Sequence, residues 1–211
     1  MTTLEIILLC TCSLLAIIFI VVRTLKGGVM ALTLKTIASF GFVTSAVIGL
    51  ILNSTLVNQT KWALGLLIIG LLLGMIGDIV LDLKVIYNND NWYLNTGMGA
   101  FFLGHLCYIT AFSLLANLES LLLPLVIAGG SSILLTTSIT LSSKKIGLNF
   151  GKFLIQTIAY TTLLTFAMSY SLILALLGGG LWLTFIGMTL FFLSDIVLSF
   201  QYFGGRDCPR G

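Results

Sequence analysis

Seven long apolar runs divide the chain and constrain its fold more than any other feature. They cover residues 4–22, 29–52, 62–83, 96–118, 121–141, 150–175 and 181–203. Each run is close to the length of about 20 residues that an α-helix needs to cross the hydrocarbon layer of a membrane. Only 8% of the residues are charged, against about 25% in soluble domains, so the chain could not cover a water-facing surface. We therefore predict an all-α fold, a polytopic transmembrane helical bundle with seven spans.

The same composition excludes several classes of protein. Scarce polar surface excludes a soluble enzyme domain, and the low content of charge and proline excludes a disordered chain. The net charge of +3 is spread thinly, so nucleic acid is not an expected partner. No basic leader or cleavage site precedes the first run, which we expect to be retained as a span. We predict one transmembrane domain over residues 1–203 and a short polar tail over residues 204–211.

The four cysteines do not indicate a disulfide framework. Cys10 and Cys12 are two positions apart, so on a helix they point in different directions. Cys107 lies within a predicted span and Cys208 lies in the tail. We expect all four to be small, buried apolar side chains.

The basic residues predict the direction of the spans. Eight of the ten fall in the first, third and fifth connections or in the tail, namely Arg23, Lys26, Lys84, Lys144, Lys145, Lys152, Arg206 and Arg210. Lys61 lies on the opposite side and Lys35 lies within a span. Because connections rich in lysine and arginine stay in the cytoplasm, we expect an N-terminus outside and a cytoplasmic tail. Short loops favour a bacterial plasma membrane.

Few ionisable side chains lie inside the predicted spans, where each costs about 2.5–3.5 kcal/mol at a helix centre on insertion scales. They are Lys35, Asp78, Asp82, His105 and Asp195, and Tyr108 and Tyr160 can join them. At about 1.5 Å of rise per residue, the ionisable groups all fall in the cytoplasmic half, although their helices alternate in direction. We therefore predict one shared polar pocket.

Glycines accompany these residues at helical spacing. Stripes at intervals of four residues are Gly70, Gly74, Asp78 and Asp82; Gly97, Phe101 and His105; and Gly187, Phe191 and Asp195. Since glycine permits close contact between helices, each stripe should face the interior of the bundle.

The balance of charge indicates acid/base chemistry. Three carboxyl groups against one lysine and one neutral histidine leave excess negative charge, so one carboxyl group should hold its proton. A single histidine excludes a zinc site with three histidine ligands, and no nucleophile elbow or phosphate loop is present. We expect no metal and no cofactor. The classes that remain are an intramembrane hydrolase acting on a lipid, a proton-coupled transporter that uses the same carboxylates, and a non-catalytic lipid-binding membrane protein.

Three motifs, in order along the chain, resemble the lysoplasmalogenase (YhhN-like) family. They are Gly77-Asp78-x-x-Leu81, Gly97-x3-Phe101-x3-His105-x2-Tyr108 and Phe192-x-Ser194-Asp195. Lys35-Thr36 stands where that family usually has Lys-Pro. The resemblance covers residues 30 to 200. It also implies an eighth span where this sequence has its polar tail, so one helix of the family is expected to be missing.

The resemblance implies hydrolysis of the vinyl-ether bond of lysoplasmalogen, a lysophospholipid, to a fatty aldehyde and a glycerophospho headgroup. Its implied partners are that substrate and membrane lipids. On this basis we expect Asp78 and Asp195 to act as the acid/base pair, with His105 orienting water. Supporting or substrate-binding roles are expected for Lys35, Asp82, Tyr108 and Tyr160.

The residues alone leave other roles open. Lys35 could serve only to neutralise an aspartate, and Asp82 could cap a helix at the membrane interface. His105 could be a buried histidine with no chemical role.

Overall fold

The computed structural model describes residues 3–25, 28–52, 56–87, 91–116, 118 and 120–204. Seven α-helices occupy them: α1 (Thr3–Leu25), α2 (Gly28–Leu52), α3 (Asn58–Tyr87), α4 (Asn91–Ala116), α5 (Leu122–Ser143), α6 (Leu154–Leu176) and α7 (Trp182–Phe203). A short 3₁₀ helix, η1 (Gly151–Phe153), precedes α6. The described residues contain no strand, and one isolated β-bridge joins Leu148 to Gly204. The prediction of an all-α fold with seven helices is confirmed.

The chain forms two compact units, residues 1–107 and residues 108–210. The first unit holds α1, α2, α3 and the first part of α4, and the second holds the end of α4 with α5, η1, α6 and α7. The single domain expected over residues 1–203 stays a prediction. Lys26 and the tail after Gly204, with Arg206, Cys208 and Arg210, lie outside the described residues.

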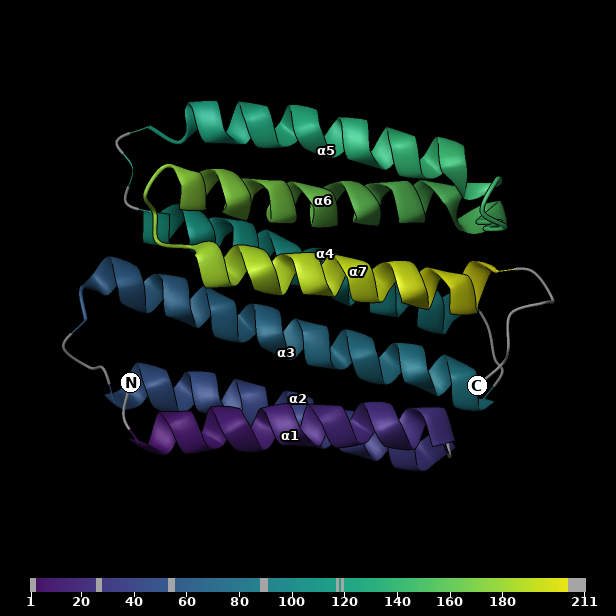
Figure 1. Cartoon of the computed structure of the whole chain (residues 1–211), viewed down its shortest axis with the longest axis horizontal. Helices are drawn as coiled ribbons and strands as arrows, with labels where there is room; N and C mark the ends of the chain where they lie inside the picture. Colours follow the sequence, from purple (N-terminus) through teal and green to yellow (C-terminus); the bar gives the residue numbers. More distant parts are fainter. Residues whose placement is uncertain are drawn as a thin grey trace. The chain divides into compact units, whose positions relative to one another are not determined.

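In the first unit, α1 packs against α2 and α2 packs against α3 (Figure 1). α1 and α2 approach each other closely at Gly41, where a Cβ atom would lie 2.6 Å from Sγ of Cys12. Cys12 is buried as predicted, but Cys10 is exposed, so its predicted burial is wrong. The reason is that two residues turn a helical side chain through about 200°. Cys107 is half-buried.

Four glycines bring α3 and α4 into close contact in the same unit. A Cβ on Gly77 would lie 3.2 Å from the carbonyl oxygen of Gly97, and a Cβ on Gly104 would lie 3.2 Å from that of Gly70. Because the later glycine of α3 contacts the earlier glycine of α4, and the earlier one contacts the later one, the two helices are antiparallel. The prediction that glycine permits close contact is confirmed here, but the contacting glycines of each helix are seven residues apart rather than four. Seven residues are nearly two full turns, so both glycines of a helix share one face.

In the second unit, α6 packs against both α5 and α7. α5 buries small side chains at intervals of four residues, namely Pro124, Ala128, Ser132 and Thr136. Oγ1 of Thr136 lies 3.2 Å from Oγ1 of Thr165, so a hydroxyl pair joins the two helices. α6 is thereby covered on two sides.

The prediction that Gly187 faces the interior of the bundle together with Asp195 is wrong. Gly187 is exposed, and a Cβ atom there would meet nothing within 4 Å. Gly187 and Asp195 are eight residues apart, which rotates them by about 80° relative to each other at 3.6 residues per turn. Gly187 therefore faces outward while Asp195 is half-buried.

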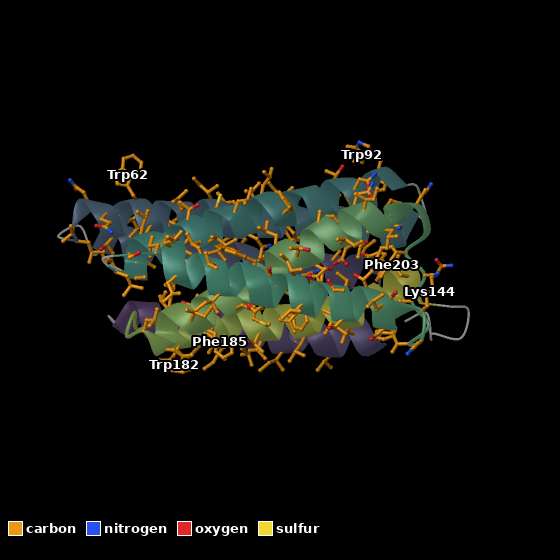
Figure 2. The ribbon with its side chains drawn as sticks, turned by 90° about the horizontal axis from the view of Figure 1, so that it is seen from above. Trp62, Trp92, Lys144, Trp182, Phe185 and Phe203 are labelled. Atoms are coloured by element: carbon orange, nitrogen blue, oxygen red, sulfur yellow. The ribbon has the colours of Figure 1, made fainter. Side chains whose placement is uncertain are left out.

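Six helices, α2 to α7, are long and apolar enough to cross a membrane within the part of the chain that the structure describes. In α1 the apolar stretch found among the described residues, Cys10–Phe19, is shorter than the other six. That α1 crosses the membrane therefore stays a prediction. Exposed tryptophans mark opposite ends of the first unit, where Figure 2 shows Trp62 and Trp92. Tryptophan at both ends is typical of the two membrane–water interfaces.

Candidate functional site

Lys35 on α2 contacts two carboxyl groups on α3. Its Nζ lies 2.8 Å from Oδ1 of Asp78 and 3.5 Å from Oδ2 of Asp82. The three side chains are 17%, 28% and 8% exposed, respectively. Asp78 and Asp82 are one helical turn apart, so both can face α2. The structure thus brings three predicted site residues together in what we call the Lys35 cluster.

The Lys35 cluster places two carboxyl groups beside one ammonium group. A charge inside a membrane segment is tolerated when an opposite charge lies next to it. One proton on either carboxyl group would make the cluster neutral. Asp82 is buried and lies more than a turn before the end of α3 at Tyr87, so it does not cap that helix at the interface.

Replacing Lys35 by methionine is expected to destabilise the protein by about 3 kcal/mol, because the change removes an ammonium group from beside two part-buried carboxyl groups. The same replacement should cost less in an Asp78→Asn background, where one carboxyl group is already neutral. Thermal unfolding of the wild type, both single variants and the double variant in detergent measures this coupling. Equal losses in both backgrounds would show that the ion pair contributes no stability.

His105 on α4 is buried in the first unit and is 1% exposed. Its Nδ1 lies 2.7 Å from the carbonyl oxygen of Phe101, one turn earlier. Because a carbonyl oxygen can only accept, Nδ1 carries the proton, and Nε2 of the neutral ring is then the acceptor. The spacing Phe101-x3-His105 therefore sets the tautomer. An acceptor nitrogen fits the predicted role in orienting water, and that role stays a prediction.

The second unit brings two other predicted site residues together. The hydroxyl group of Tyr160 on α6 donates a hydrogen bond to Oδ2 of Asp195 on α7. Both residues are half-buried, and the bond fixes the orientation of the carboxyl group. Tyr108, in the part of α4 that belongs to this unit, stacks on Phe112 with ring centroids 6.3 Å apart.

A polar contact between α4 and α6 in the second unit was also not predicted. The Ser113 Oγ and the Tyr170 hydroxyl oxygen lie 2.8 Å apart, and Tyr170 is fully buried. This contact joins the end of α4 to α6. A search of the sequence limited to ionisable side chains cannot find it, whereas a search for every hydroxyl group within a span would.

The predicted site residues therefore fall into the Lys35 cluster of the first unit and the Tyr160–Asp195 pair of the second. His105 and Tyr108 make their described contacts within α4. The single shared pocket stays a prediction.

Among the described residues, six helices are long and apolar enough to span a membrane, and an ion-paired cluster joins two of them, which fits a multi-pass helical membrane protein. Within that class, the model of the YhhN family matches residues 37–210, so the chain belongs to the YhhN family. This family is known as lysoplasmalogenase-like, and the resemblance noted from the sequence motifs is confirmed. Searches of curated proteins and of solved structures found no match.

Proposed function

We propose that the protein hydrolyses the vinyl-ether bond of lysoplasmalogen by acid/base catalysis with intramembrane carboxyl groups. The observation that carries this proposal is the Lys35 cluster, which holds two carboxyl groups inside the membrane segments of a YhhN-family chain. Carboxyl groups kept in such segments at a cost are expected to serve a function. A substrate that is itself a lipid can reach these groups from the membrane.

The reaction needs one proton donor, one water molecule and one group that balances positive charge. Protonation of the β-carbon of the vinyl ether gives an oxocarbenium ion at the carbon next to the ether oxygen. Water adds to that carbon and returns a proton, which forms a hemiacetal. The hemiacetal then loses the glycerophospho alcohol and leaves the fatty aldehyde. The net change consumes one water molecule and requires neither a covalent nucleophile nor an oxidant.

Asp78 and Asp195 are assigned as the acid/base pair. Lys35, 2.8 Å from Asp78, provides the opposite charge for an ionised carboxylate there. Asp78 is therefore the group that stabilises the oxocarbenium ion and accepts the proton of water. Delivery of the proton to carbon then falls to Asp195. His105, with its acceptor Nε2, and Tyr108 assist by orienting water or the glycerol hydroxyl group, and Asp82 supports Asp78.

The decisive experiment uses the purified full chain in detergent with an alkenyl lysophospholipid, with aldehyde release as the readout. Release that depends on protein, and is not seen with the saturated alkyl ether analogue, supports the proposal, because only the vinyl ether can be protonated on carbon. Solute flux driven by a pH gradient in liposomes without aldehyde release would identify a transporter instead. Retention of unchanged lysolipid would identify a lipid-binding protein.

Replacing Tyr160 by phenylalanine is expected to lower kcat about tenfold with little change in KM, because the Asp195 carboxyl group loses the hydroxyl that orients it. Steady-state kinetics with the alkenyl lysophospholipid measure both constants. Tyr93→Phe, which also removes one phenolic hydroxyl but on the first turn of α4, is the matched control and should keep wild-type kinetics. An unchanged kcat in Tyr160→Phe would contradict a positioning role for this residue.

A further inference from the structure

The connection between α5 and α6 is the most basic described segment of the second unit. This basic loop, residues 144–153, carries Lys144, Lys145 and Lys152, and all three are exposed. Among the described residues of that unit, one is acidic, and it is Asp195 within α7. The basic loop therefore presents three positive charges without an acidic residue in its own sequence.

Backbone and ring contacts join the basic loop to the end of α7. An antiparallel bridge joins Leu148 to Gly204, and the amide of Asn149 donates to the carbonyl oxygen of Phe203 at 2.9 Å. The ring of Phe150 meets the ring of Phe203 edge to face with centroids 5.0 Å apart. Gly147 and Gly151 flank the residues that contact α7, and both have positive φ angles, which allow the chain to turn there. The end of α7 thus anchors the middle of the loop that carries the three lysines.

Exposed apolar side chains border the lysines. Leu141, in the last turn of α5, is 74% exposed, and Ile155, in the first turn of α6, is 80% exposed. Figure 2 shows Lys144 and Phe203 at the same end of the unit, with Trp182 and Phe185 toward the other end. Lysines at the border of such apolar surface lie at the level of lipid headgroups, where their stems contact acyl chains and their ammonium groups reach phosphates.

We propose that the basic loop binds the headgroup phosphates of anionic phospholipids in the leaflet that it faces. Zwitterionic lipids carry their own cation beside the phosphate, whereas an anionic lipid such as phosphatidylglycerol carries an unbalanced charge that the lysines can neutralise. The exposed Leu141 and Ile155 add contacts with the acyl chains that a free phosphate ion cannot make. This site is independent of the hydrolase activity proposed above.

The test places the purified full chain in nanodiscs with equal amounts of phosphatidylglycerol and phosphatidylcholine and counts the bound lipids by native mass spectrometry. Wild-type protein should retain phosphatidylglycerol preferentially. Each substitution Lys144→Gln, Lys145→Gln or Lys152→Gln should lower that preference up to about fivefold at low salt. Raising the salt concentration should weaken the preference of the wild type, because exposed charges are screened.

Two controls separate charge from fold and position. The triple Lys→Arg variant keeps the charges and should keep the preference, while Lys61→Gln, on α3 in the first unit, removes one lysine elsewhere and should leave the preference unchanged. A triple Lys→Gln variant that still prefers phosphatidylglycerol would overturn the proposal, as would an equal loss in Lys61→Gln. Displacement of phosphatidylglycerol by equimolar inorganic phosphate would show a phosphate ion site and would overturn the lipid site.

Discussion

Replacing Asp78 or Asp195 by asparagine is expected to reduce aldehyde release from lysoplasmalogen by at least about 10²-fold, because a side-chain amide can neither deliver nor accept the proton that the reaction needs. Asparagine has nearly the shape of aspartate, so the packing around each position should survive. It can still accept hydrogen bonds from Lys35 or from Tyr160 through its carbonyl oxygen. The rates of the two variants and of the wild type, measured at saturating substrate, test the assignment.

Two further variants sharpen that experiment. Ser138→Ala removes an exposed hydroxyl group of α5 whose described bond is to its own helix at Leu134, and it should keep wild-type activity. Asp82→Asn should lower activity less than Asp78→Asn, because Asp82 is assigned a supporting role. Retained activity in both Asp78→Asn and Asp195→Asn, with folded protein, would eliminate carboxyl acid/base catalysis at these positions.

Replacing Gly77 by valine is expected to destabilise the protein by about 2–3 kcal/mol. A Cβ atom there would lie 2.8 Å from two ring carbons of Phe101 and 3.2 Å from the carbonyl oxygen of Gly97. The ring can move, but the backbone of Gly97 can give way only if α4 shifts as a whole. Thermal unfolding in detergent, followed by far-UV circular dichroism, measures the loss.

Gly65 on the same helix provides the matched control. A Cβ at Gly65 would meet nothing within 4 Å, so Gly65→Val changes the helix propensity by the same amount without a collision. Gly65→Val should therefore be as stable as the wild type or slightly more stable. Similar losses in the two variants would show that the contact of α3 with α4 does not depend on glycine at position 77.

The helices could be predicted from the sequence because a membrane imposes one simple requirement on every span. A segment in lipid must satisfy its backbone hydrogen bonds internally, so an apolar run of sufficient length becomes a helix. The ends were less well predicted. α4 begins at Asn91, before its apolar run, because polar residues such as Asn91 and Asn95 can continue a helix into the interface.

The site could be predicted in part. The depth of a side chain along a helix follows from counting residues. The sequence therefore predicted correctly that Lys35, Asp78 and Asp82 lie at a similar depth and can contact one another. Direction around the helix is harder to predict, since an error of one residue rotates a side chain by about 100°. For that reason neither the pairing of Tyr160 with Asp195 nor the outward position of Gly187 could be derived.

The glycine contacts also have a mechanical consequence. Gly77 contacts Gly97 and Gly70 contacts Gly104. These two close backbone contacts fix the axial register of α3 relative to α4. Sliding α3 along α4 by one helical turn would bring Leu73 or Leu81 to the place beside Gly97 where only a hydrogen atom now fits. The lengthwise register of Asp78, beside Gly77, is therefore locked to that of His105, beside Gly104. The two glycine contacts therefore oppose sliding of α3 along α4, and a hinge or a roll is the relative movement that disturbs them least.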